Sequence, residues 1–195
     1  MDAVRVDRKR ASRMSASIDQ LFAGMAKAEI NGSGTYMDDG LYVVETKNIF
    51  VKKGTNPQKP GDSFIAEFTV IESNNPKHAV GSSGSYVLKF SNIFAMGNIV
   101  EFVMALLGYE NTKENQKNEE IRKEVDLVTR ATCGSDAAKK ELGDLYEEGM
   151  LRGIRVRLEC TKKPTAPKPG KPDGGVFTVH KWSPLPAPEG QPAAA

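Results

Sequence analysis

The strongest constraint on the fold is the order in which two kinds of hydrophobic periodicity follow each other along the chain. Runs with strand-like alternation occupy residues 41–53, 63–73 and 85–91, and two more occupy 152–163 and 176–184. Between these groups, residues 92–110 repeat apolar side chains at helical spacing, and more polar helical segments follow at about 113–129 and 135–148. This order predicts a mainly β domain of the α+β class, with five strands and a principal helix between the third and fourth.

The first of these runs is long for a single strand. This length predicts a strongly curved strand with a bend or bulge partway along it, and both of its ends, Leu41/Val43 and Ile49/Val51, are expected in the core. Phe64, Phe68 and Phe90 have apolar neighbours two residues away, which predicts that all three belong to the core rather than to a binding face.

Composition fits one globular domain with appendages, because the 195 residues are 39% hydrophobic and 27% charged. No apolar run of about 18 residues occurs and the N-terminal segment is charged, so neither a membrane span nor a secretory signal is predicted and an intracellular location is expected. Three parts are predicted. They are a basic arm with a short amphipathic helix (1–39), the main domain (40–183, with a helical insertion at about 111–149) and a Pro/Ala-rich tail (184–195).

Metal and cofactor chemistry is not indicated by the cysteines and histidines. Cys133 and Cys160 lie far apart with no C-x-x-C spacing, and His78 and His180 belong to no ligand cluster. We therefore expect two reduced thiols, with Cys160 in the core of a strand, and no metal or other cofactor.

Charge is distributed unevenly along the chain, although its net value is only +2. Acidic residues concentrate in the helical middle, whereas the predicted strands are mostly basic. In "GIRVRLECTKK", alternation places Ile154 and its apolar partners on one face and Arg155 and Arg157 on the other. A strand that only had to stay soluble would not need two neighbouring arginines, so the sequence indicates a cationic face.

The element order is also that of an OB-fold, a partly open Greek-key barrel that commonly binds oligonucleotides. The chain resembles the phage-type single-stranded DNA-binding proteins through "GLYVVETKNIFVKKG", "GDSFIAEFTVIES", "GSYVLKFSN", "RGIRVRLEC" and "GGVFTVHKWSP", over roughly residues 40–183. The resemblance lies in element order, length and basic-aromatic strands. It departs in the C-terminal tail, which lacks the acidic end by which many such proteins recruit replication partners, and in the long helical insertion.

Binding of a single strand requires cations along the phosphates and aromatic faces on which bases stack. The candidates for phosphate contact are Lys47, Lys52, Lys53, Lys59, Lys89, Arg152, Arg155, Arg157, Lys162, Lys163 and Lys181; the candidates for stacking are Tyr42, Phe50, Tyr86 and Trp182. Two alternatives stay open: Trp182 could instead plug the bottom of the barrel, and Arg155 and Arg157 could pair with glutamates of a neighbouring strand. The lysine-containing loop at residues 52–62 resembles a loop that closes over a bound strand.

Catalytic motifs are not recognised in the sequence. Asp38 and Asp39 are adjacent and flanked by glycine, which is typical of a turn rather than a catalytic carboxylate pair. We therefore expect a non-catalytic single-stranded DNA-binding protein of replication, recombination or repair, with RNA as a further ligand to test. Self-association or docking of a replication protein would use the helical insertion. The alternative is a structural or protein-interaction module, such as a virion or scaffold component with a β-barrel core.

Overall fold

The computed structural model describes residues 37–54, 61–167 and 174–186. The predicted arm and amphipathic helix in residues 1–36, Lys59 in the basic loop, and residues 187–195 of the tail lie outside these ranges.

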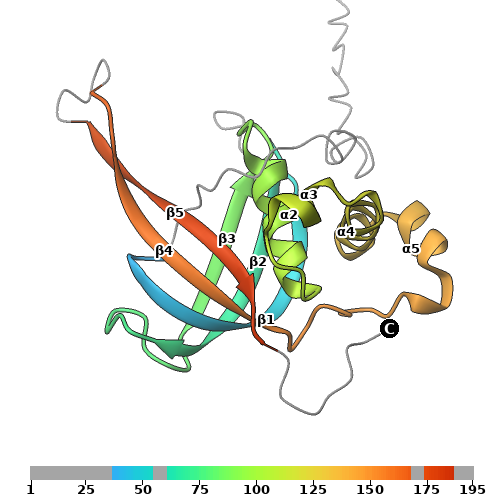
Figure 1. The fold of residues 1–195 in the computed structure, drawn as a ribbon, viewed down its shortest axis with the longest axis horizontal. Coiled ribbons are helices and arrows are strands. Elements are labelled where there is room, and N and C mark those ends of the chain that lie inside the picture. Colours follow the sequence, from blue (N-terminus) through green and yellow to red (C-terminus); the bar gives the residue numbers. More distant parts are fainter. Residues whose placement is uncertain (1–36, 55–60, 168–173, 187–195) are drawn as a thin grey trace, which may run out of the picture.

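Five strands form one antiparallel sheet with the order β3-β2-β1-β4-β5. Their bounds are β1 (Gly40–Lys52), β2 (Ser63–Ser73), β3 (Ser83–Lys89), β4 (Arg155–Thr165) and β5 (Gly175–Pro184). The α+β class, the five strands and the helices between β3 and β4 are thus confirmed (Figure 1). Within the described residues β3 and β5 share no backbone pairing, so the sheet is open and closure into a barrel is not seen.

The helices follow β3 in the predicted order but are more broken than their periodicity indicates. They are α2 (Ala95–Leu106), α3 (Lys113–Lys117), α4 (Glu119–Thr132), α5 (Asp136–Leu142) and the 3-10 turn η2 (Gly143–Leu145). The segment predicted as one helix at 113–129 is divided at Asn118, whose side chain accepts hydrogen bonds from the first amides of α4. None of the helices in the described ranges combines the length and the apolar character needed to cross a membrane.

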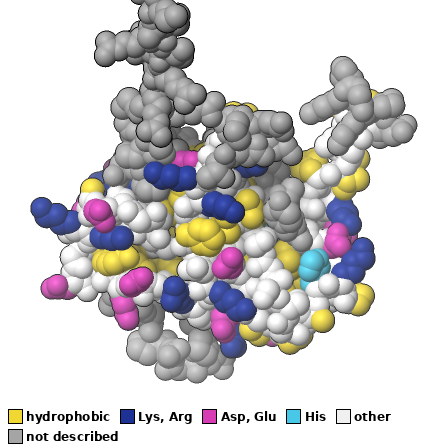
Figure 2. Space-filling view, turned by 180° about the vertical axis from the view of Figure 1, so that it is seen from behind, with side chains coloured by type: hydrophobic (Ala, Val, Ile, Leu, Met, Phe, Trp, Pro, Cys, Tyr) yellow, Lys and Arg dark blue, Asp and Glu magenta, His cyan; other side chains and the backbone are white. Residues whose placement is uncertain are grey.

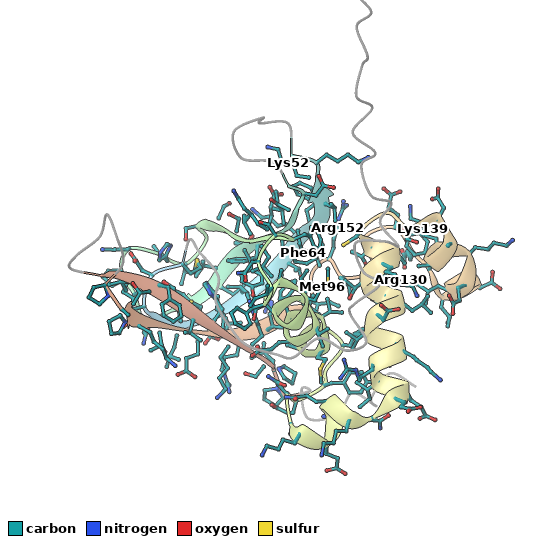
Figure 3. All side chains as sticks on the ribbon, turned by 90° about the horizontal axis from the view of Figure 1, so that it is seen from above. Lys52, Phe64, Met96, Arg130, Lys139 and Arg152 are labelled. Carbon is teal, nitrogen blue, oxygen red and sulfur yellow. The ribbon has the colours of Figure 1, made fainter. Side chains whose placement is uncertain are left out.

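The core lies between α2 and the inner face of the sheet. Phe64 and Phe68 are fully buried there, as predicted, and Phe90 packs against the same cluster. Figure 3 shows Phe64 between the sheet and α2, where its ring lies 6.2 Å from that of Phe102. Cys160 is buried within β4 as a free thiol, also as predicted.

The sheet curls so far that side chains of its two edge strands touch. The Tyr86 ring of β3 lies 5.2 Å from the rings of both His180 and Trp182 of β5, centroid to centroid. Phe102 of α2 closes this group at 4.7 Å from Trp182. Aromatic contacts therefore join β3 to β5 where no backbone pairing does.

A β-bulge in β1 changes which residues face the core. Thr46 pairs with Phe68 and Asn48 with the preceding residue of β2, so Lys47 is an extra residue. The inward positions consequently shift from even to odd numbers, and both Thr46 and Ile49 are buried. The predicted bulge is confirmed.

The phase before the bulge differs from the expectation. Tyr42 and Val44 line the core, whereas Leu41 is 51% exposed. Val43 is buried too, but its register places it on the same side of the sheet as Leu41. The prediction that Leu41 is a core residue was wrong, because a bulge reverses the alternation that a straight strand would keep.

The β4–β5 hairpin extends beyond the rest of the sheet. Pairing of β4 with β1 ends at Gly40 and Cys160, so residues 161–165 and 175–179 pair only with each other. Figure 1 shows this two-stranded ribbon running away from the helices. Its side chains are therefore open on more than one side.

Candidate nucleic-acid interface

The outer face of the sheet, turned away from α2, has a row of half-buried apolar side chains. Phe50 of β1 is paired with Ile65 of β2, which is paired with Val87 of β3, and all three are partly exposed. We call these residues the Phe50 row. It provides an aromatic ring and two aliphatic neighbours on a rigid three-stranded surface.

Cations border the Phe50 row on the same face. Ser63 of β2 is paired with Lys52 of β1 and with Lys89 of β3, and these residues lie next to the row. Both lysines are exposed. Lys53 follows Lys52 directly and is also exposed. Within the described ranges no carboxylate forms an ion pair with these lysines, so their charges are available to a ligand. Figure 3 shows Lys52 at the edge of the molecule.

Arg152 approaches the same region from the segment before β4. Its guanidinium donates a hydrogen bond of 3.3 Å to Oδ1 of Asn48, two residues before Phe50. Arg152 also lines a cavity of about 160 Å³ together with Lys139 of the helical insertion. Figure 3 labels both residues. The predicted phosphate ligand Arg152 thus lies beside the outer face rather than within a strand.

The two arginines of β4 lie on the outer face, but their surroundings differ. Nε of Arg155 is 2.7 Å from a carboxylate oxygen of Glu45 on β1, which realises the alternative of a cross-strand ion pair. Arg157 is exposed and has no such partner among the described residues. Arg157 is therefore better placed than Arg155 to meet a phosphate.

The projecting ribbon adds a cation and an aromatic side chain that lie opposite each other. Lys163 of β4 is paired with Phe177 of β5, and alternation places both on the outer face with Lys181. Lys163 and Lys181 are exposed, and Phe177 is partly exposed. Phe177, Ile65 and Val87 were not among the candidate residues predicted from the sequence. The alternation of side chains along each strand could have identified them, but only after the position of the bulge in β1 showed which residues face outward.

The outer face is not uniformly cationic, although acidic residues concentrate in the helical middle of the sequence and the predicted strands are mostly basic. Its glutamates are Glu45, Glu67, Glu72 and Glu159, placed there by the same register. Figure 2, which shows the molecule from behind, has hydrophobic side chains exposed next to both Lys/Arg and Asp/Glu. Both signs are interspersed, so the phosphate-binding capacity depends on which cations lack acidic partners.

Three of the four predicted stacking residues are buried in the core. Tyr42, Tyr86 and Trp182 are 2%, 1% and 1% exposed, so they cannot offer an open ring face to a base. The expectation for these three is corrected, and of the four only Phe50 is partly exposed. These three side chains point to the inner side of their strands, where bulky aromatic rings fill the space beneath the curled sheet. For Trp182 this agrees with the alternative that it fills the core.

Lys47 and Lys162 are engaged within the protein. Nζ of Lys47 is 3.3 Å from the Ser83 hydroxyl, and Nζ of Lys162 is 3.0 Å from a carboxylate oxygen of Asp38. Interactions with Lys162 and then Lys77 lower the pKa of the Asp38 carboxyl. The Asp38–Asp39 pair thus ties the start of β1 to its neighbours, as its turn-like sequence indicates.

Two ionisable side chains are buried near the contact between β3 and β5. Glu101 of α2 accepts a hydrogen bond of 3.1 Å from the amide of Trp182, and burial raises its pKa to about 6. Burial lowers the pKa of His180 to about 4. Among the described residues no group of three or more His, Cys, Asp or Glu side chains could hold a metal ion.

Taken together, the outer face presents an apolar row with lysines along one side, the exposed Arg157 and a projecting ribbon with a second aromatic ring. This arrangement suits a ligand that combines flat apolar groups with regularly spaced anions. Comparisons of the chain with protein-family models, with curated proteins and with solved structures find no match.

Proposed function

We propose that this is a non-catalytic, OB-type protein that binds single-stranded DNA on the outer face of its sheet. The observation that favours this most is the Phe50 row bordered by Lys52 and Lys89. A base stacked on an aromatic side chain contributes about 1–3 kcal/mol, and the lysines beside the row would neutralise phosphates of the same strand.

The curl of the sheet supports the finer assignment to the OB-fold. A partly open five-stranded barrel brings its edge strands near each other without a full ladder. Here the edge strands are β3 and β5, and they meet through Tyr86, His180 and Trp182. The β1–β2 and β4–β5 connections leave the sheet beside the cations Lys52 and Lys163, as loops that flank an oligonucleotide would.

The number of cations without an ion pair sets an upper limit on how steeply binding depends on salt. They are Lys52, Lys53, Lys89, Arg157, Lys163 and Lys181, none of which forms an ion pair within the described ranges. If each neutralised one phosphate, log K against log salt would have a slope of about −4 for a single strand. Glutamates on the same face would make the observed slope shallower.

The test is fluorescence anisotropy with labelled oligo-dT and with a duplex of equal length, at about 50 and 200 mM salt. We expect preference for the single strand and a loss of affinity of up to about 300-fold over this range, which follows from the slope. An oligo-rU competitor measures the preference for DNA over RNA. No binding to either form at low salt would contradict the proposal.

Arg155 and Arg157 provide a matched pair for the same assay. Arg157→Ser should weaken binding and reduce the slope by about 0.7, because one phosphate contact is lost. Arg155→Ser should have a smaller effect, since Arg155 is already neutralised by Glu45. Equal effects of the two substitutions would show that the ion pair does not determine which arginine contacts the strand.

The second candidate is a structural or protein-interaction module. The four glutamates of the outer face favour it, because interspersed charges are also typical of a surface that stays soluble or meets another protein. Such a module would bind oligo-dT weakly at every salt concentration, and the Arg157→Ser protein would behave like the wild type.

A further inference from the structure

Two adjacent apolar side chains protrude from the turn between β3 and α2. Ile93 is 87% exposed and Phe94 is 42% exposed. Exposed aliphatic residues are common singly, but an aromatic neighbour in the same turn makes a compact apolar tip. We call Ile93 and Phe94 the apolar tip.

Hydrogen bonds fix the apolar tip in place. The amide of Asn92 donates to the Lys89 carbonyl (2.9 Å), and the Asn92 side chain accepts from the Phe94 amide (3.0 Å). The Ala95 amide donates to the Asn92 carbonyl (3.0 Å), so the turn runs directly into α2. The tip is therefore preorganised, which lowers the entropic cost of binding through it.

The apolar tip lies at the cationic end of the sheet. The Phe90 amide donates to the Asp62 carbonyl at 3.1 Å, which joins this turn to the base of the β1–β2 loop. Lys52 and Lys89 are aligned on β1 and β3 at this end, with the Phe50 row in the adjacent register position. The row and the tip thus lie on opposite sides of the register position that holds Lys52 and Lys89.

We infer that Phe94, supported by Ile93, stacks on a base of the same strand that crosses the Phe50 row. This inference rests on the proposed function and extends its site around the end of the sheet. A strand that leaves the row keeps its phosphates near Lys52 and Lys89, and its next unstacked base meets the exposed Phe94 ring. The nearby lysines favour a polyanion with apolar faces over a purely apolar partner.

The experiment compares two ligands of equal length, oligo-dT and an oligomer made entirely of abasic sites, which has the same phosphates without bases. Phe94→Ala should weaken oligo-dT binding about 5- to 150-fold and leave abasic binding within about twofold of wild type. Phe94→Tyr keeps a ring and should retain oligo-dT affinity. Leu145→Ala is the control, because Leu145 is 77% exposed on the helical insertion.

The outcomes separate this inference from the proposed function. Oligo-dT binding by Phe94→Ala equal to wild type would overturn the inference and leave the proposed function standing. Equal losses on both ligands would also overturn it, because the side chain would then act through structure or charge. If the wild-type protein binds neither ligand, the proposed function fails and the inference fails with it.

Discussion

Glu101 and His180 are buried in the same core, yet they respond to acid in opposite directions. The pKa of His180 is lowered from 6.5 to about 4, and that of Glu101 is raised from 4.5 to about 6, in each case mainly by burial. Their contributions to stability should therefore oppose each other over a shared pH range.

For His180 the unfolded chain binds the proton first as the pH falls. Its contribution to stability is present above pH 6.5 and is lost as the pH approaches about 4. A shift of this size corresponds to about 3 kcal/mol in total, or about 1.4 kcal/mol per pH unit.

For Glu101 the folded protein binds the proton first. Its contribution is fully present below pH 4.5 and is lost as the pH rises through about 6. This amounts to about 2 kcal/mol, with the same slope and the opposite sign. Between pH 6 and 4.5 the two effects should cancel.

Glu101→Gln removes one side of this balance and keeps an oxygen that can accept the hydrogen bond of the Trp182 amide. We expect its free energy of unfolding to fall, relative to wild type, by about 2 kcal/mol between pH 6 and 4.5. Urea titrations can follow Trp182, the only tryptophan of the chain and a buried one. All other titrating groups are common to both proteins, so they cancel in the difference. If the two pH profiles ran parallel, the opposed titration would be refuted.

Three further predictions concern packing, thiols and a helix cap. Gly84→Ala should destabilise the protein by about 1–3 kcal/mol in urea titrations, because a methyl group there would lie 2.4 Å from the Phe68 ring. Cys133 and Cys160, whose pKa burial raises to about 12, should react with a thiol reagent only after unfolding; rapid labelling of the native protein would contradict their burial. Asn118→Ala should cost about 1 kcal/mol of stability, since its side chain accepts two amide hydrogen bonds at the start of α4; an unchanged melting temperature would show that this cap is dispensable.

Much of the fold could be predicted because the local periodicity was unambiguous. The bounds of β2 agree with the alternating run at 63–73, and the apolar stripe of α2 is buried throughout. The polar helices were harder, since a narrow stripe continues across a capping residue such as Asn118 and hides the break. Whether the edge strands β3 and β5 pair depends on how far the sheet curls, and the sequence of a single strand does not determine this.

The candidate site was less predictable, because it depends on which phase of each strand faces outward. Residue types alone made Tyr42, Tyr86 and Trp182 attractive for stacking, but the space beneath the sheet takes large aromatics equally well. Phe177 was missed because apolar residues occur on both sides of its strand, so alternation alone does not say which side faces outward. Its pairing with Lys163 assigns it to the outer face.

The bulge at Lys47 connects the fold to the candidate site. Without the extra residue, alternation from Thr46 would turn Phe50 and Lys52 inward and would expose Ile49. With it, β1 contributes Thr46 and Ile49 to the core and Phe50 and Lys52 to the outer face, where β2 and β3 complete the row. The Phe50 row therefore depends on the bulge at Lys47.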